Sequence, residues 1–475
     1  MKVGFLTAEV YPFSKVGGLA DVAGSLPIFL KNKGIQIIIL SPFYSRFKRE
    51  IEINPVEKIK YKINFNLRDY EIEWLKIIHK DVEFYLLKYE DFYGRDYIYV
   101  PPSGEDELQY LRFAFFSFCS LDLFKKINFK PDILHINDWH TSFIPIYLKE
   151  IFKDDEFYKN TKVLLSIHNL SYQGIYEKEI LKEINLKEEI FDKLSHFNKI
   201  NFLKGGIIFS DYINTVSPSY AKEILTPEFG CGLEEVLKSK REKIFGILNG
   251  IDYEEFNPEK DKEIYENFNL ENFKEGKRKN KIELKKNLGF ENKERLLIGM
   301  VSRLTYQKGI DFLIEVMDEF LKRELDFVLL ATGEKKYEDA LNNLERKYKD
   351  KFKFIPKFDQ KLAKKIYAGS DVFLIPSRFE PCGLTQMISM RYGTIPFGYK
   401  TGGLKDTIKD FEEEGWGFVF DKYEKDSFLK KLDKIIKLYY EDKKSWEDLI
   451  IKCMKKDFSW LSSAEEYIKL YRKML

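Results

Sequence analysis

Short runs of apolar residues alternate with segments of helical periodicity along most of the chain. Runs of four to six residues that are mostly apolar are typical of strands buried in a parallel sheet. These runs occur at Val3–Leu6, Ile35–Leu40, Ile133–Ile136, Val163–Ile167, Tyr212–Val216, Leu296–Val301, Phe327–Ala331, Phe352–Ile355 and Val372–Ile375. Helical spacing lies between them, at Leu19–Lys33, Gly309–Leu321 and Gln360–Ala368. The alternation predicts an α/β fold with parallel sheets and right-handed crossovers.

The strand runs form two series, separated by a stretch of different composition. Residues 257–286 are rich in Lys, Glu and Asn, and we interpret them as a solvated connector near a domain boundary. The second series starts at about Arg295, and residues 457–475 have the spacing of a terminal amphipathic helix. A chain of 475 residues is too long for one compact domain, so we expect two.

The charge balance gives no general attraction to nucleic acid or to an anionic membrane. The 79 basic and 77 acidic residues leave a net charge of +2. The four cysteines are widely scattered, without metal-type spacing, which favours a reduced, cytoplasmic compartment. The amino-terminal apolar run is interrupted by Glu9 and is too short for a signal peptide, and no stretch is long enough to span a bilayer.

A glycine pair joins the first predicted strand to a helix. Gly17 and Gly18 would let backbone N–H groups approach an anion at the positive end of that helix. Lys15 would add a point charge for a phosphate. Asp21 either belongs to the site or only complements the helix dipole.

Two further polar clusters follow strands in the first half of the chain, where ligands of open α/β sheets bind. One is His135–His140, which contains Asp138, and the other is Ser166–Gly174, which contains His168. Three of the five histidines fall in these clusters, which favours contact with a substrate. The alternative is structural: Asp138 would cap the next helix, and the histidines would be ordinary core residues.

Three clusters follow strands in the second half. Arg303 and Lys308 are cations that could clamp a diphosphate and stabilise its departure. The segment Pro376–Gln386 offers Glu380 for sugar hydroxyls, and Gly383, Leu384 and Thr385 would present backbone N–H groups to phosphate. The alternative for Arg303 and Lys308 is a pair of solvated surface cations, and the alternative for Glu380 is a plain turn without a ligand. Cys382 is better explained as a small apolar filler than as a nucleophile, and a further glycine pair at Lys400–Thr407 allows either ligand contact or a simple turn.

Taken together, these stretches closely resemble the family of bacterial glycogen synthases and plant starch synthases. The family's ordered motifs appear as Lys15–Val22, Asp138–His140, Ile167–Gly174, Thr215–Pro218, Ile247–Asp252, Ser302–Gly309 and Pro376–Gln386, with Asp457–Trp460 resembling its closing motif. The resemblance covers residues 1 to about 461. It implies two Rossmann-like domains facing across a deep cleft (GT-B type), residues 1–252 for the acceptor and sugar and 253–456 for the nucleotide diphosphate, with the helix at 457–475 crossing back to the first domain.

The resemblance also implies the reaction. Glucose would pass, with retention of configuration, from ADP-glucose or UDP-glucose to the non-reducing 4-hydroxyl of an α-1,4-glucan, without a metal or other cofactor. The residues implied as catalytic are Asp138, His168, Arg303, Lys308 and Glu380. Those implied to bind the nucleotide sugar are Lys15, Gly17, Gly18, Asp21, Asn249, Phe358, Cys382, Gly383, Leu384 and Thr385.

Some positions depart from the family pattern. Val16 replaces the usual threonine, Phe358 stands where relatives have a tyrosine that stacks on the base, and Ile388 occupies the place of a second glutamate found in related transferases. Three alternatives stay open from the sequence: a transferase for a small acceptor, a glucan phosphorylase that holds pyridoxal phosphate on a lysine, and an inert glucan-binding protein. The sequence specifies no oligomeric state.

Overall fold

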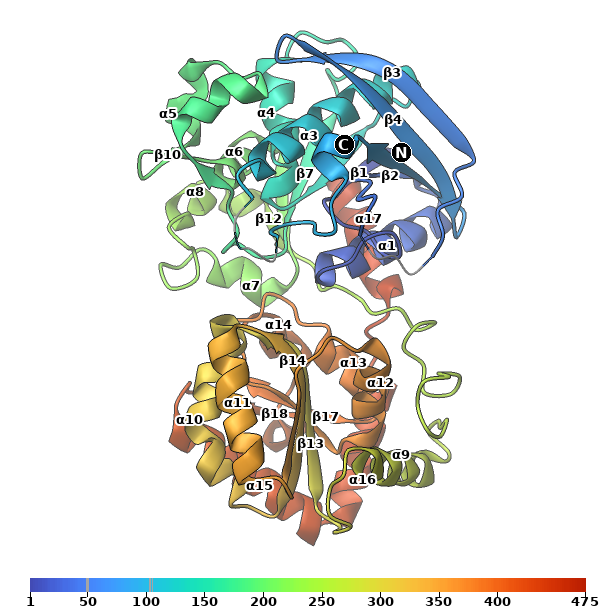
Figure 1. Cartoon of the computed structure of the whole chain (residues 1–475), viewed down its shortest axis with the longest axis vertical. Helices are drawn as coiled ribbons and strands as arrows, with labels where there is room; N and C mark the ends of the chain where they lie inside the picture. The colour runs from blue at the N-terminus through green and yellow to red at the C-terminus, as the bar shows by residue number, and fades with distance from the viewer. Residues whose placement is uncertain (48–50, 102–103, 105) are drawn as a thin grey trace. The chain divides into compact units, whose positions relative to one another are not determined.

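The alternating pattern folds into two units, each built on a largely parallel sheet (Figure 1). The computed structural model describes residues 1–47, 51–101, 104 and 106–475. Unit 1 comprises Met1–Gly250 and Trp460–Leu475, and unit 2 comprises Ile251–Ser459. The prediction of an α/β fold with parallel sheets and two Rossmann-like domains is confirmed.

The strands of unit 1 lie in the order β12-β11-β7-β6-β1-β2-β5-β4-β3. All neighbours from β12 to β5 pair in parallel, and their carboxyl ends therefore meet at one edge. Their bounds are β1 Lys2–Leu6, β2 Gln36–Pro42, β3 Glu57–Phe65, β4 Arg68–His79, β5 Val82–Lys88, β6 Ile133–Asn137, β7 Lys162–Ile167, β11 Tyr212–Thr215 and β12 Ile244–Gly246. A small separate sheet contains β8 Ile175–Tyr176, β10 Lys199–Asn201 and β9 Ser195–His196.

One edge of the unit 1 sheet differs from the parallel arrangement that the sequence predicts. Strands β3, β4 and β5 pair antiparallel, through tight turns at Asn66-Leu67 and Lys80-Asp81. All four turn residues have positive φ, between 47° and 62°. A hairpin turn of this hand matches the twist of the strands, but it normally uses Gly or Asn at both positions. Leu67 and Lys80 therefore gave the sequence no recognisable turn signal.

The two faces of the unit 1 sheet are covered by different helices. Val3 and Phe5 belong to a core with α1 and α17, whereas Gly4 lies against Phe124 of α3 on the other face. The helices of unit 1 are α1 Gly18–Asn32, α2 Glu90–Tyr93, α3 Gln109–Lys126, α4 Phe143–Glu150, α5 Phe191–Leu194, α6 Phe202–Phe209, α7 Pro218–Glu223, α8 Glu234–Lys238 and α17 Trp460–Met474.

Helix α17 belongs to the core of unit 1 although it ends the chain (Figure 1). It packs beside α1 and buries Trp460, Tyr467 and Tyr471. Two of these bond to the sheet: the Tyr471 hydroxyl lies 2.7 Å from Nδ1 of His135, and Asn214 donates to the Tyr467 hydroxyl at 3.0 Å. The first domain is therefore completed by the last residues of the sequence.

Unit 2 has the strand order β15-β14-β13-β16-β17-β18, parallel throughout. Figure 1 shows α10 and α11 on one side of this sheet and α12 and α13 on the other. The strands are β13 Leu296–Leu304, β14 Leu325–Gly333, β15 Phe352–Ile355, β16 Val372–Ile375, β17 Ile395–Tyr399 and β18 Phe418–Phe420. The helices are α9 Phe273–Asn287, α10 Ile310–Leu321, α11 Lys335–Lys347, α12 Gln360–Gly369, α13 Thr385–Arg391, α14 Gly402–Thr407, α15 Lys425–Glu441 and α16 Lys443–Lys455.

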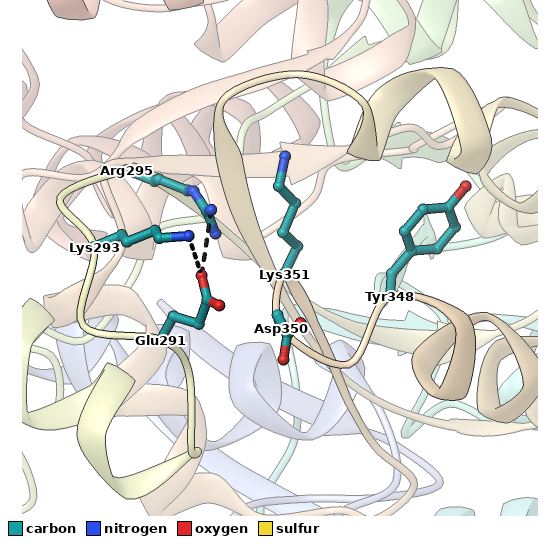
Figure 2. A pocket seen from close by; sticks show the side chains of 6 residues that line it. All are labelled: Glu291, Lys293, Arg295, Tyr348, Asp350 and Lys351. Atoms are coloured by element: carbon teal, nitrogen blue, oxygen red, sulfur yellow. Dashed lines mark hydrogen bonds and ion pairs between the residues drawn. The ribbon is translucent and has the colours of Figure 1, made fainter.

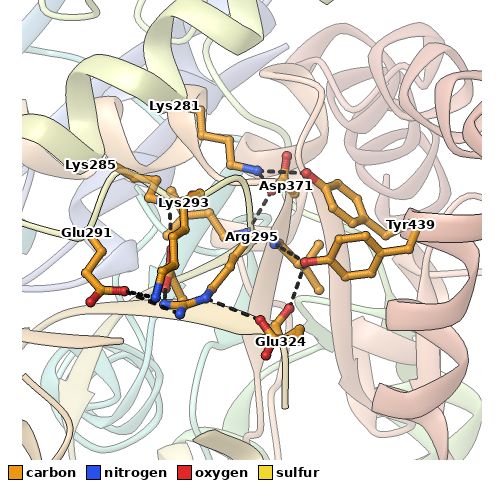
Figure 3. Close-up of polar contacts among 12 residues, drawn as sticks. Lys281, Lys285, Glu291, Lys293, Arg295, Glu324, Asp371 and Tyr439 are labelled. Atoms are coloured by element: carbon orange, nitrogen blue, oxygen red, sulfur yellow. Dashed lines mark hydrogen bonds and ion pairs between the residues drawn. The ribbon is translucent and has the colours of Figure 1, made fainter. Parts of the chain in front are cut away.

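The prediction of a solvated connector at residues 257–286 is wrong for its second half, which forms α9. Lys277, Lys281 and Lys285 recur every four residues and so share one helix face, which is largely buried. Figure 3 shows Lys281 reaching Asp371 at the amino end of β16, at 2.6 Å. Lys285 binds Asp326 near the amino end of β14, also at 2.6 Å. The polar composition of this face favoured the prediction of an exposed segment, but each lysine ammonium has partners inside unit 2.

The third lysine of this face has no carboxylate partner among the residues that the structure describes. The Lys277 ammonium donates to the carbonyls of Ala368 and Tyr392 and to the Thr394 hydroxyl, at 2.8–3.1 Å. Burial lowers the pKa of this ammonium from 10.5 to about 7. Three acceptors matched to three N–H donors explain how a lysine is accommodated there.

We expect Lys285→Ala to destabilise unit 2, because Asp326 is 1% exposed and would lose its nearest cation. Leaving a buried charge unpaired costs about 3 kcal/mol or more, and the cost here is smaller because Arg295 stays 3.3 Å from Asp326. The midpoint of urea unfolding, followed by a fluorescent probe in unit 2, measures this change. Lys286→Ala is the matched control, since its side chain is 74% exposed on the same helix. Equal midpoints for the two variants would contradict the role given to α9.

Candidate functional site

The carboxyl ends of three neighbouring strands gather the predicted polar residues of unit 1. The order β7-β6-β1 places His168 after β7, Asp138 after β6, and the turn that contains Lys15 after β1. Asp138 is bonded to the loop after β7, because its Oδ1 accepts the backbone N–H of His168 at 2.7 Å. The parallel register thus brings together residues that lie more than a hundred positions apart in sequence.

Asp138 has a strained backbone and a buried carboxyl. Its φ of 54° and ψ of −172° fall in a region used almost only by glycine. Burial raises its pKa from 3.8 to about 7, although the N–H groups of His168 and Asn169 oppose the rise. The side chain makes no capping bond to the following helical turn, so the alternative that Asp138 is a helix cap is wrong. Such strain at a strand end is typical of functional residues.

His168 carries a neutral imidazole with a defined tautomer. Its Nε2 lies 2.9 Å from Oδ1 of Asn137, whose amide donates to the carbonyl of Leu6. The Asn137 oxygen is therefore an acceptor, and Nε2 of His168 must be the protonated nitrogen. Burial lowers the pKa of the ring to about 4. His168 thus presents an unprotonated Nδ1, which can accept a hydrogen bond from a hydroxyl group.

His135 does not belong with these residues, although its cluster in the sequence suggested that it might. It lies within β6, is 1% exposed, and bonds to Tyr471 and to Ser166. Burial lowers its pKa to about 3. His135 is a core residue that joins the sheet to α17. Trp139 is likewise buried, at 4% exposure, as the structural alternative predicted.

The turn after β1 is held by two carboxylates of the chain. Lys15 pairs with Asp21 of α1 at 2.6 Å. The N–H groups of Val16 and Gly17 both donate to Oε2 of Glu9. Sequence analysis expected the glycine pair to offer its N–H groups to an external anion, and for Gly17 this is wrong, since an internal carboxylate already accepts that bond. Gly18 is the first residue of α1.

At the carboxyl edge of the unit 2 sheet, Lys308 and Glu380 form an ion pair. They follow the neighbouring strands β13 and β16, and Nζ of Lys308 lies 2.6 Å from Oε2 of Glu380. That oxygen also accepts from the Ser377 hydroxyl at 2.9 Å. Glu380 is 6% exposed, so it does not stand in a plain surface turn. Arg303 differs: it is exposed, and its guanidinium makes no hydrogen bond or ion pair within the described residues.

The remaining predicted residues fall at both sheets' carboxyl edges. Phe358 follows β15 and is 74% exposed, as a stacking platform requires. Asn249 is 6% exposed, and its Oδ1 has no hydrogen-bond partner in the described parts of the chain. Cys382 is buried at 5% exposure, and Gly383 has a φ of 74°. Leu384 is the N-cap residue of α13, and Thr385 is the first residue of that helix.

A pocket of about 250 Å³ lies at the opposite, amino-terminal edge of the unit 2 sheet (Figure 2). Its lining is Glu291, Lys293, Arg295, Tyr348, Asp350 and Lys351. Arg295 binds three carboxylates there, and Lys351 donates to the carbonyls of Leu321 and Arg323. These cations already have partners, and none of the predicted site residues lines this pocket. Among the described residues there is no cluster of three or more metal-ligating side chains and no helix long and apolar enough to cross a membrane.

Comparison with known proteins covers the whole chain. The starch synthase catalytic domain family matches residues 2–239, and the glycosyl transferases group 1 family matches residues 280–450. Glycogen synthases of Thermotoga petrophila and Fervidobacterium nodosum are each 44% identical, over 100% of this chain and 99% of theirs. The chain belongs to the glycogen and starch synthase family. It is a glycosyltransferase, as the resemblance of its motifs implied.

Solved structures agree with this family. The catalytic domain of starch synthase IV from Arabidopsis thaliana, bound to ADP and acarbose, superposes with a TM-score of 0.91 at 32% identity, covering 100% of this chain and 99% of that one. Sucrose-phosphate synthase from Thermosynechococcus elongatus has a TM-score of 0.62 at 14% identity, covering 100% and 98%, a likeness of fold alone. The fold is the GT-B arrangement of two Rossmann-like domains.

Three further polar residues surround the unit 1 site in this synthase-family chain, and the sequence pattern does not predict them. Glu9 is 1% exposed beside the Lys15 turn, and Tyr99 donates its hydroxyl to Glu9 at 2.8 Å. Arg112 of α3 donates to the carbonyls of Ile98 and Tyr99. Glu9 was visible as a charge that interrupts an apolar run. Tyr99 and Arg112 carried no signal, because long-range contacts alone bring them to the site.

We expect the buried carboxyl of Asp138 to make stability depend on pH. Because the folded pKa is raised from 3.8 to about 7, the group favours folding most below pH 4, and this contribution is lost as pH rises to 7. The loss is at most about 1.4 kcal/mol per pH unit. The fall in melting temperature between pH 5.5 and 8 should be smaller in Asp138→Asn. Some fall remains, because burial also raises the pKa of Glu9 to about 7.

The control for this experiment is Asp192→Asn, which removes an exposed carboxylate from the same unit. Its melting temperature should follow the wild-type profile. If Asp138→Asn also follows the wild-type profile, Asp138 is ionised throughout this range and its burial does not shift its titration.

Proposed function

We propose that this protein is a glucan synthase that transfers glucose from ADP-glucose to the non-reducing 4-hydroxyl of an α-1,4-glucan. The observation that carries the proposal is 44% identity to a curated glycogen synthase along the whole chain. The ADP and acarbose in the related starch synthase structure support a nucleotide-sugar donor and a glucan acceptor. ADP-glucose is the donor we favour, with UDP-glucose as the alternative. We place the activity in the cytoplasm.

In this proposal, unit 2 binds the leaving group. Arg303 and Lys308 would contact the diphosphate, with Lys15 as a further cation from unit 1. Arg303 is suited to this because its guanidinium has no partner within the described chain. Phe358 would stack on the nucleobase, while Cys382 and the backbone N–H groups of Gly383–Thr385 would contact the sugar and the phosphates.

Unit 1 would hold the glucose near the bond that breaks. Asp138 and the unprotonated Nδ1 of His168 would accept hydrogen bonds from sugar hydroxyls. Asn249 offers a buried oxygen that has no partner among the described residues. Glu380 would contact the far side of the glucose. Gly17, Gly18 and Asp21 would act through the turn that carries Lys15, since Asp21 pairs with that lysine.

The reaction breaks the bond between C1 of glucose and the phosphate oxygen, and forms a bond between C1 and O4 of the acceptor. We favour a front-face route, in which the diphosphate leaves first and then takes the proton from the acceptor hydroxyl. The positive charges of Arg303 and Lys308 would stabilise the charge that develops on the diphosphate. A route through a glucosyl ester would need a carboxylate nucleophile, and we prefer Asp138 as a group that orients the sugar.

The test is incorporation of glucose into glycogen by the purified protein, with ADP-glucose and UDP-glucose in parallel. We expect incorporation with release of an equal amount of ADP, and a smaller rate with UDP-glucose. Lys308→Ala should lower kcat about a hundredfold, because it removes a cation that stabilises the transition state.

Lys322→Ala removes an exposed lysine at the end of α10 and is the control. An unchanged kcat in Lys308→Ala would exclude Lys308 from catalysis. Absence of incorporation from either donor, by a folded protein, would contradict the proposal, and transfer to a sugar phosphate would then identify a small-acceptor transferase.

A further inference from the structure

Glu9 is a buried carboxylate that the proposed reaction does not use. It lies between β1 and α1, with 1% of its surface exposed. Oε2 accepts the N–H groups of Val16 and Gly17, the latter at 3.1 Å, and Oε1 accepts the Tyr99 hydroxyl at 2.8 Å. All three bonds come from segments that border the site.

These bonds fix the direction of the turn. The two N–H groups point inward, to Glu9, and an external phosphate could reach them only by displacing a buried carboxylate. The Lys15 side chain, by contrast, is 26% exposed and is held by Asp21. The turn therefore presents a side-chain cation to a ligand and keeps the N–H groups of Val16 and Gly17 for internal use.

The second oxygen of Glu9, Oε1, is bonded to a segment that is itself held by buried contacts. Arg112 is fully buried, pairs with Asp106, and donates to the Ile98 carbonyl at 2.9 Å. It thereby holds the backbone beside Tyr99, whose hydroxyl bonds to Glu9. Glu9 thus connects the Lys15 turn to a second segment that is fixed by α3.

Keeping a carboxylate at this position costs stability. Burial raises the pKa of Glu9 from 4.5 to about 7, and the nearby charge of Asp21 adds to the rise. The bonds from Val16, Tyr99 and Gly17 act in the opposite direction. At pH 8 the group is ionised, and each N–H bond to it is charge-assisted.

We propose that Glu9 is a positioning residue for donor binding: it holds the Ser14–Gly18 turn through the N–H groups of Val16 and Gly17, so that Lys15 meets the diphosphate. This inference rests on the proposed function, because it takes the diphosphate as the ligand of Lys15. The proposed role depends on the length of the Glu9 side chain, which brings an oxygen to the two N–H groups, more than on its charge.

Two conservative variants separate reach from charge. Glu9→Gln keeps an oxygen where both N–H groups need it but removes the charge. Glu9→Asp keeps the charge but withdraws the carboxylate by about 1.5 Å, one C–C bond, beyond hydrogen-bonding distance of Gly17. Glu73→Asp is the matched control, since Glu73 is a largely buried glutamate on β4 that pairs with Lys60 and Lys88.

The experiment measures KM for ADP-glucose, kcat and calorimetric ADP binding at pH 8. We expect Glu9→Asp to raise the donor KM and the ADP Kd about tenfold, the value of one charge-assisted hydrogen bond, with a smaller change in kcat. Glu9→Gln should stay within about threefold of wild type. In a Lys15→Ala background, Glu9→Asp should have little further effect on ADP binding, because the two residues act through one turn.

Equal impairment of both Glu9 variants would show that the charge matters and would overturn the proposal. So would a fall in kcat with unchanged KM, or a full additional effect of Glu9→Asp in the Lys15→Ala background. ADP binding keeps the test independent of glucose transfer. A wild-type protein that binds ADP but transfers no glucose contradicts the proposed function, and the comparison of Glu9→Asp with Glu9→Gln still decides the role of Glu9.

Discussion

The candidate site residues of each unit depend on one constraint: two lysines and a pair of N–H donors are held by carboxylates of their own unit. Lys308 is paired with Glu380, Lys15 with Asp21, and the turn amides with Glu9. In a partly buried site, an unpaired charge is costly, so internal anions stabilise the ligand-free protein. If the lysines bind a diphosphate as proposed, the diphosphate has to compete with these carboxylates for them. Arg303 is different, since it has no partner within the described chain and needs no exchange.

In each unit, the parallel sheet brings residues from distant segments of the chain to the same edge. In unit 1, the adjacent strands β1, β6 and β7 are followed by Glu9 and Lys15, by Asp138 and by His168. In unit 2, the adjacent strands β13 and β16 are followed by Lys308 and Glu380. The opposite edge of the unit 2 sheet has another role. There α9 and Arg295 hold the amino ends of the strands through Asp326 and Asp371, and the cations that line the pocket are paired with groups of the same unit (Figures 2 and 3).

The pattern of apolar and polar residues predicted the strands and helices whose formation depends on neighbouring residues in the sequence. The runs at Phe352–Ile355 and Val372–Ile375 match β15 and β16 to the residue, and the spacing after Trp460 matches α17. The antiparallel edge was missed because Leu67 and Lys80 take positive φ without being turn-forming residues. The buried face of α9 was not predicted, because its lysine-rich composition favoured an exposed segment. The spacing of its lysines, four residues apart, was the one sign of a helix face. Partners such as Tyr99 and Arg112 depend on tertiary contacts and could not be predicted from periodicity.

The competition between internal carboxylates and the diphosphate can be measured directly by calorimetric titration of ADP into the wild-type protein and into Glu380→Gln. ADP lacks the glucose that Glu380 would contact, so this variant acts on ADP binding through the partner of Lys308, and its amide oxygen can still accept the Ser377 hydroxyl. We expect ADP to bind Glu380→Gln about threefold to tenfold more tightly, since a partly buried ion pair of this kind is worth about 1 kcal/mol. Weaker or unchanged ADP binding would contradict the account, because Glu380 would then support Lys308 rather than compete for it.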